Sequence, residues 1–177
     1  FSLGPGGITA HVRFLRSTGR NSLALRLLSA SRERSPEDAL SREEFAWCLL
    51  SADRAAEARD LLAKEKRVSP ILAIEVACAA GDWSSLRRVA GEEERMSSVM
   101  TTRPSAVWID RAALALASLG EGEEEPLRAL LRDAGEHAQV LDRLHRWGKE
   151  LIHPLLDEVR TRLERVAPGR LDTERRR

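Results

Sequence analysis

The chain has 177 residues, of which 42% are hydrophobic and 32% are charged, so it can bury a core and is not of the disordered class. Tyrosine is absent and aromatic residues make up only 4%, which argues against a β-rich domain because aromatic and β-branched residues favour strands. Alanine, leucine, arginine and glutamate dominate, and all four form helices readily. The composition therefore predicts an all-α protein.

The net charge is only +1, but basic residues concentrate at the two ends of the chain. Residues 1–35 contain six arginines against Glu33 alone, and residues 160–177 contain seven arginines against three acids. Basic ends around an acidic middle suit a chain whose termini contact an anionic partner, but they equally suit a solvated helical surface with a basic tail. There is no run of about 18 apolar residues, so the sequence predicts no membrane span.

The two cysteines and the start of the chain bear on the compartment. Cys48 and Cys78 fall in apolar parts of predicted helices, a placement typical of buried thiols rather than of a disulfide or a metal pair. We therefore expect an intracellular, reducing compartment. Residues 1–8 lack the basic start and apolar core of a signal peptide, and we expect this Gly- and Pro-rich segment to be flexible. Residue 1 is not Met, so it is either a processed N-terminus or an artificial boundary.

Four helical hairpins are expected in the first three quarters of the chain. Their approximate bounds are 9–35, 36–69, 70–103 and 104–135. In the first hairpin, Thr9 precedes a short amphipathic helix, Gly19 ends it, and Asn21 begins a second apolar helix. Two apolar helices joined by about three residues are expected to be antiparallel neighbours.

The second hairpin repeats the pattern of the first at a fixed spacing. Gly19 aligns with Asp53 at the turn between the two helices. Ser35–Pro36 aligns with Ser69–Pro70 at the start of the following unit, where Ser is a preferred N-cap and Pro is tolerated in the first turn. This spacing, about 34 residues in both comparisons, indicates stacked repeat units.

The third and fourth hairpins are less regular. The turn at Gly81–Asp82 comes earlier than the spacing of the first two hairpins requires. The surplus before Pro104 forms either a helical extension or a loop. In the fourth hairpin, we expect Gly120 to end the first helix and Pro126 to begin the second after an acidic turn.

The repeat spacing is lost beyond Gly135. Apolar residues then follow a helical period up to Ile152, His153–Pro154 interrupts it, and a last amphipathic helix precedes Pro168–Gly169. We expect residues 136–168 to be C-terminal capping helices, because terminal repeats need a polar outer face. Residues 169–177 are expected to form a basic tail.

Several motifs in the periodic part resemble the tetratricopeptide and pentatricopeptide helical-repeat superfamily. DRAAEARDLL resembles the second helix of a tetratricopeptide unit, with Ala58 and Leu62 in the small and large packing positions. STGRNSLALRLL and ACAAGDWSSLRRVA are similar to pentatricopeptide units, with a small-residue helix end, Gly, a polar pair and an apolar second helix. AVWIDRAALALASLG fits the first helix of such a unit. The resemblance is to a degenerate member and implies a right-handed α-solenoid of antiparallel helical hairpins.

The resemblance implies two kinds of partner. Tetratricopeptide arrays bind peptides and proteins in a concave groove. Pentatricopeptide arrays bind single-stranded RNA, mostly in organelles, and degenerate ones serve as scaffold subunits of mitochondrial ribosomes and other large complexes. The chain has no convincing match to the pentatricopeptide residues that read RNA bases.

Seven arginines near the two ends of the chain are candidate contacts to RNA or another anionic partner: Arg13, Arg16, Arg20, Arg26, Arg175, Arg176 and Arg177. The first three lie at i, i+3 and i+7 on one side of the first helix and, with the fourth, could contact phosphates. The same pattern suits an ordinary solvated helix face, and the three terminal arginines are ambiguous in the same way.

The four tryptophans are candidate anchors for a partner protein: Trp47, Trp83, Trp108 and Trp147. Each lies within or next to an apolar helix, so we expect most of them to pack between repeats. A tryptophan left exposed on the concave side would be a strong anchor.

No catalytic or metal-binding constellation is predicted. His137, His145 and His153 recur every eight residues, whereas a helical metal pair needs i, i+4 spacing. Zinc-site spacing of Cys and His is absent. The run Glu123–Glu125 resembles an exposed acidic turn rather than paired catalytic carboxylates in a cleft. We therefore expect no catalytic residue, no metal, no cofactor and no small-molecule substrate.

These observations favour a non-catalytic scaffold or adaptor subunit of a larger assembly, with protein subunits as partners. A ribonucleoprotein such as a mitochondrial ribosome is one candidate assembly, and the mitochondrial matrix is one candidate compartment. The alternative is an organellar, pentatricopeptide-like protein that binds single-stranded RNA.

Overall fold

A computed structural model describes residues 5–34, 39–65, 68–100 and 104–168 of the chain. These residues form ten α-helices and no strand, which confirms the prediction of an all-α protein. The chain divides into two compact units, Phe1–Val76 and Ala77–Arg177. Among the helices that the model describes, none combines the length and the apolar character needed to cross a membrane.

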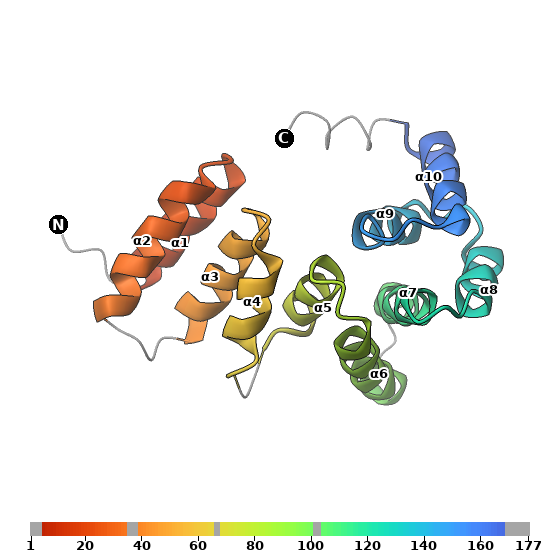
Figure 1. Ribbon diagram of the computed structural model, residues 1–177, viewed down its shortest axis with the longest axis horizontal. Helices are drawn as coiled ribbons and strands as arrows, with labels where there is room; N and C mark the ends of the chain where they lie inside the picture. Colours follow the sequence, from red (N-terminus) through yellow and green to blue (C-terminus); the bar gives the residue numbers. More distant parts are fainter. Residues whose placement is uncertain (1–4, 35–38, 66–67, 101–103, 169–177) are drawn as a thin grey trace. The chain divides into compact units, whose positions relative to one another are not determined.

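The first unit contains two helical hairpins. Its helices are α1 (Pro5–Ser17), α2 (Asn21–Arg34), α3 (Ala39–Leu50) and α4 (Ala55–Leu62), and α5 (Pro70–Ala79) carries the boundary to the second unit. α1 packs beside α2, α3 packs beside α4, and α3 also contacts both helices of the first hairpin (Figure 1).

Two apolar clusters fill the first unit and share members. One is built from buried side chains of α1 and α2, with Cys48 of α3. The other joins α3, α4 and the start of α5. Leu25 of α2 and Phe45 of α3 pack against both clusters, so the two hairpins have a continuous core.

The second unit is organised around one apolar helix. Its elements are α6 (Trp83–Met100), α7 (Pro104–Gly120), α8 (Glu125–Ala134), α9 (Ala138–Trp147) and α10 (Pro154–Val166). α7 contacts α6, α8 and α9, and α10 packs on α8 and α9. The buried face of α7 is rich in alanine, which lets the neighbouring helices approach closely.

Four turns close in the same way. At the first, Gly19 has φ 74°, its N–H donates to the Arg16 carbonyl at 3.0 Å, and the Arg20 N–H donates to the Leu15 carbonyl at 2.8 Å. This is the Schellman arrangement, which needs a left-handed residue and satisfies carbonyls at the helix end. The same pair of bonds and a positive φ recur at Asp53, Gly81 and Gly122.

The turn positions confirm the irregular spacing. The left-handed residues of the first three turns are Gly19, Asp53 and Gly81, and the second interval is shorter than the first. The third turn is therefore early, as predicted. The surplus that follows it is helical, because α6 continues to Met100.

The predicted helix end at Gly120 is confirmed. α7 ends at Gly120, and the left-handed residue of the turn that follows is Gly122. A Cβ at Gly120 would lie 2.4 Å from the side chain of Trp83. This glycine is needed for the close approach of Trp83, not for the turn, and the sequence pattern does not distinguish the two uses.

Other predicted ends are confirmed or shifted. α5 begins at Pro70 with the Ser69 carbonyl accepting the first helical bond, and α8 has Pro in its first turn and ends at Ala134 with Gly135 as its C-cap. α1 begins at Pro5 rather than after Thr9, since Pro suits the first turn and Thr9 is buried. Residues 1–4, Ser35–Pro36 and the tail 169–177 lie outside the described residues.

The predicted helix from Val140 to Ile152 is too long. α9 ends at Trp147, and Ile152 is fully exposed in the connection to α10. His153 precedes Pro154 as the N-cap of α10, and its Nδ1 accepts the Leu155 N–H at 3.2 Å. The interruption at His153–Pro154 is therefore confirmed, and a side-chain cap fixes the start of the new helix.

Candidate functional site

The candidate functional site is a groove between α7 and α9 in the second unit. α9 buries Val140, Leu141, Leu144 and Trp147 along one stripe. This amphipathic pattern packs α9 on α7 and leaves its adjoining face to polar side chains. The groove between the two helices holds a hollow of about 320 Å³, near the lower end of the range for ligand pockets.

The groove has an apolar floor and a polar rim. α7 contributes three of its lining residues: Trp108, Ile109 and Ala112. α9 and the residue before it contribute the others: His137, Gln139, Val140, Asp142, Arg143 and Arg146. A floor of this kind can bury part of a guest side chain, while the rim can recognise a charged or polar group.

Two arginines near the groove stack on tryptophans. The guanidinium of Arg111 lies 4.9 Å from the ring centroid of Trp108 and donates a hydrogen bond to Asp133 at 2.7 Å. The guanidinium of Arg143 lies 5.4 Å from the ring centroid of Trp147. These cation–π contacts hold the guanidinium groups in place and cover part of each ring.

Arg146 has unused hydrogen-bonding capacity. Its Nε is 3.8 Å from a carboxylate oxygen of Asp142, too long for a hydrogen bond. This Nε is buried and has no hydrogen-bond partner among the described residues. Because buried donors are nearly always paired, a guest that supplies an acceptor here would complete the site.

The four candidate tryptophans lie in different environments. Trp108 lines the groove, whereas Trp147 is only 2% exposed and is packed inside the second unit. Trp83 is half-buried against Gly120, and Trp47 is half-buried beneath Arg16. The structure therefore leaves Trp108 as the tryptophan best placed to touch a partner.

The four arginines predicted in the first hairpin as contacts to an anionic partner fall into two groups. Arg13 Nε donates to Glu44 at 2.5 Å, and Arg16 Nη1 lies 3.6 Å from the second carboxylate oxygen of Glu44. Glu44 is only 4% exposed, so these two guanidinium groups compensate a buried charge. Arg20 and Arg26 are exposed and have no ion pair with any described residue. Arg175, Arg176 and Arg177 lie outside the described residues.

The two cysteines are buried and are not joined in a disulfide, as predicted. Burial raises the pKa of the Cys48 thiol to about 11, against a smaller opposing effect of the Arg16 charge. At neutral pH Cys48 is therefore a protonated side chain with little nucleophilic character.

The three spaced histidines do not meet. His137 is on the rim of the groove, and His153 caps α10 with its Nε2 3.3 Å from Glu124. The Arg128 hydrogen bond, with a smaller contribution from His153, holds the pKa of Glu124 below its usual value. The part of the chain that the model describes contains no group of three or more His, Cys, Asp or Glu side chains able to hold a metal ion.

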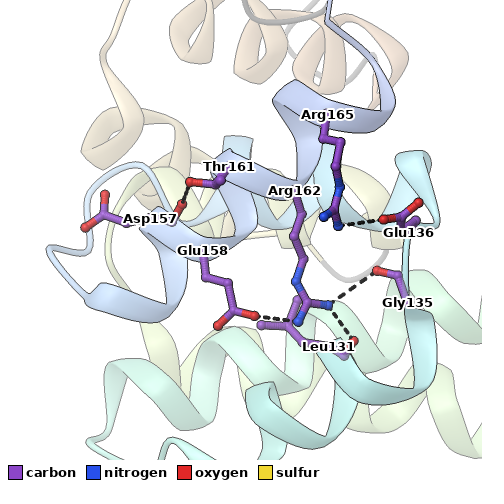
Figure 2. A network of polar contacts seen from close by, with 8 residues as sticks. All are labelled: Leu131, Gly135, Glu136, Asp157, Glu158, Thr161, Arg162 and Arg165. Carbon is purple, nitrogen blue, oxygen red and sulfur yellow. Dashed lines mark hydrogen bonds and ion pairs between the residues drawn. The ribbon is translucent and has the colours of Figure 1, made fainter.

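A second polar network joins α10 to the end of α8 (Figure 2). Arg162 donates to the carbonyls of Leu131 and Gly135 at 2.9 and 3.5 Å and to Glu158 at 2.5 Å. Arg165 pairs with Glu136 nearby. A cation at the C-terminal end of a helix complements the helix dipole and its unpaired carbonyls, so this network is structural.

Three residues of these sites were not predicted from the sequence: Arg143, Arg146 and Arg162. Arg143 and Arg146 lie at i, i+3 on the polar side of α9, a spacing that is visible in the sequence but is common on solvated helices. Comparisons of the chain with protein-family models, with curated proteins and with solved structures find no match. The geometry of the groove and of the exposed charges is therefore the basis for assigning a function.

Proposed function

We propose that this chain is a non-catalytic scaffold subunit that binds a segment of a partner protein in the α7–α9 groove. The observation that carries the proposal is the groove itself, which combines an apolar floor with two arginines at its rim. The buried Nε of Arg146 has no hydrogen-bond partner among the described residues, so an acceptor from the partner would be favourable there.

The two arginines of the groove are suited to binding. Each guanidinium group offers several N–H donors in a fixed plane and no acceptor, so Arg143 and Arg146 can bind and orient a polar group of a guest. Trp108 lines the groove, and tryptophan is a residue type enriched in binding hot spots.

We further propose that the hairpins form a right-handed solenoid of the tetratricopeptide or pentatricopeptide kind. The recurrence of one turn geometry at four positions supports a repeated unit. The buried thiols of Cys48 and Cys78 suit a reducing compartment, such as the mitochondrial matrix. A ribonucleoprotein is one assembly in which such a subunit would serve.

Single-stranded RNA binding is the alternative function. The exposed Arg20 and Arg26 favour it, because free guanidinium groups can contact phosphates. It is supported less well than protein binding, since Arg13 and Arg16 are engaged with Glu44. Arg16 and Arg111 also lie over the rings of Trp47 and Trp108, which leaves less aromatic surface for base stacking.

Purification of the tagged chain from its native source tests the scaffold proposal. We expect one or more proteins in fixed stoichiometry with the native chain, and loss of at least one of them from the Arg143→Glu, Arg146→Glu double variant. Arg160→Glu, on the exposed side of α10, is the matched control and should keep every partner. Recovery of a lone monomer, or equal retention of partners by all three proteins, would contradict the proposal.

Binding of single-stranded RNA at low salt tests the alternative. Arg20→Glu with Arg26→Glu is the appropriate variant, because substituting Arg13 or Arg16 would also disturb the buried Glu44. If RNA binds with an affinity that falls with salt and with this variant, the alternative gains support. If the isolated chain shows no RNA affinity, the alternative fails.

A further inference from the structure

The first hairpin exposes two large apolar side chains. Phe14 of α1 is 57% exposed and Leu23 of α2 is 40% exposed. Ile152 is the other large hydrophobic side chain found exposed among the described residues, and it lies in the second unit. Isolated exposed apolar residues are common, but adjacent ones indicate a contact surface.

Phe14 and Leu23 point to the same side of the hairpin. Arg16 faces α3 through its contacts with Glu44 and Trp47, and a shift of two helical positions turns Phe14 by about 160° away from it. In α2, Leu25 packs against the cluster that joins α3, α4 and the start of α5, and the same two-residue shift turns Leu23 away from that cluster. Both side chains therefore face away from the second hairpin.

The two side chains also lie at a similar level along the hairpin. Phe14 precedes Gly19 by about as many residues as Leu23 follows it, and antiparallel helices bring such positions side by side. The ring of His11 stacks near Phe14 at a centroid distance of 6.4 Å and widens the patch. We call the surface formed by His11, Phe14 and Leu23 the outer face of the first hairpin, and we include Arg26, three residues after Leu23 in α2, and the exposed Arg20 in the connection between the two helices.

The charges on the outer face have one sign. Arg20 and Arg26 are exposed and have no ion pair with a described residue, and the sequence has no acidic residue between Phe1 and Arg32. The outer face therefore combines a central apolar pair with cationic neighbours.

We infer that the outer face of the first hairpin binds an acidic amphipathic helix of a partner protein. The apolar stripe of such a helix would pack on Phe14 and Leu23, and its flanking carboxylates would pair with Arg20 and Arg26. A second copy of this chain fits less well, because two cationic faces meeting about a two-fold axis would repel each other. RNA also fits less well, since bases could stack on the rings of His11 and Phe14 but would leave the aliphatic Leu23 without an apolar partner. The surface is separate from the α7–α9 groove and does not depend on it.

Fluorescence anisotropy with the full chain at low salt tests the inference. The probes are a labelled leucine–glutamate amphipathic peptide, a scrambled peptide of the same composition, a leucine–lysine counterpart and a single-stranded RNA. The first variant is Phe14→Asp with Leu23→Asp, with Phe14→Ser and Leu23→Ser as a milder pair if circular dichroism shows unfolding. The second variant is Arg20→Glu with Arg26→Glu. Ile152→Asp is the matched control for an exposed apolar residue elsewhere.

We expect the acidic amphipathic peptide to bind at least about tenfold more tightly than the scrambled and basic peptides, with affinity falling as salt rises. The substitutions at Phe14 and Leu23 should weaken binding at least about tenfold, and Ile152→Asp should leave it unchanged. The charge reversal at Arg20 and Arg26 should transfer the preference to the basic peptide.

Three results would overturn the inference. The scrambled or basic peptide binds the native chain as tightly as the acidic amphipathic one. RNA binds more tightly than any peptide. Light scattering shows a dimer of the native chain that the Phe14→Asp, Leu23→Asp variant abolishes, which would make a second copy the occupant.

Discussion

Arginines and tryptophans lie between neighbouring helices in both units of this protein, yet they serve different purposes. Between α1 and α3, Arg13 and Arg16 converge on the buried Glu44, and Arg16 covers Trp47. Between α7 and α9, Arg146 is 3.8 Å from Asp142 and keeps a buried N–H without a hydrogen-bond partner among the described residues. Arg16 Nη1 and Glu44 Oε2 are likewise buried without a hydrogen-bond partner in the described part of the chain, so the close pair of the first unit is Arg13 with Glu44. The comparison teaches that a carboxylate within hydrogen-bond distance makes an arginine a structural group, whereas a longer separation leaves a donor unpaired.

The largest expected effect comes from removing Glu44, the buried carboxylate that pairs with Arg13 and Arg16. Glu44→Ala should lower the free energy of unfolding by about 3 kcal/mol, because Arg16 would be left half-buried without its counter-charge. Asp142→Ala in the groove should change it by less than about 1 kcal/mol. Urea denaturation of both variants measures the difference, and equal effects would remove the distinction between the two regions.

The next largest expected effect is the pH dependence of the free energy of unfolding that comes from Cys48, near Arg16 and Glu44. Burial raises the pKa of Cys48 from 9.0 to about 11 in the folded chain. The resulting contribution to the free energy of unfolding is fully present below pH 9 and is lost as the pH rises towards 11. The loss corresponds to about 2–3 kcal/mol in the free energy of unfolding. Cys48→Ala should flatten the profile between these pH values relative to the native chain.

Cys78→Ala provides the matched control, since it removes the second buried thiol. The free energy of unfolding of the Cys78→Ala variant should still fall between pH 9 and pH 11, because Cys48 is present. A Cys48→Ala profile as steep as that of the native chain would show that other groups cause the alkaline loss.

A smaller effect is expected where an arginine pairs with helix-end carbonyls. Arg162→Ala should lower the free energy of unfolding by about 2 kcal/mol, because the carbonyls of Leu131 and Gly135 lose a charged donor. Arg160→Ala on the same helix should cost less than about 0.5 kcal/mol, as its pairing with Glu164 is exposed. Thermal unfolding checks both, and similar values would contradict a capping role for Arg162.

The smallest effects compare the turns of the first two hairpins. Gly19→Ala should lower the free energy of unfolding by about 1 kcal/mol, from the backbone alone, because nothing lies within 4 Å of the added Cβ. Asp53→Gly should raise it by about 0.5 kcal/mol, since φ 56° strains a residue with a side chain. Chemical denaturation measures both changes. A lower free energy of unfolding for Gly19→Ala and a higher one for Asp53→Gly would support the same backbone geometry at the two turns. Changes of the same sign would contradict it.

The features that the sequence predicted well are local ones. The all-α composition, the early third turn, the start of α5 at Pro70 and the C-cap of α8 at Gly135 follow from helix propensity and from residues that tolerate special backbone angles. The burial of Cys48 and Cys78 follows from their apolar neighbours along each helix. Each of these depends on interactions between residues that are close in the sequence.

The tertiary structure decided what depends on partners that are distant in the sequence. Gly120 ends α7 as predicted but also accommodates Trp83, and Arg13 looked free but pairs with Glu44. Arg143 and Arg146 belong to a groove only because α7 brings Trp108 to them. The sequence by itself determined helices and turns, since backbone preferences are local. Helix packing decided which charges are neutralised and which face a groove, because the energy of a charge depends on its burial and on its nearest counter-charge.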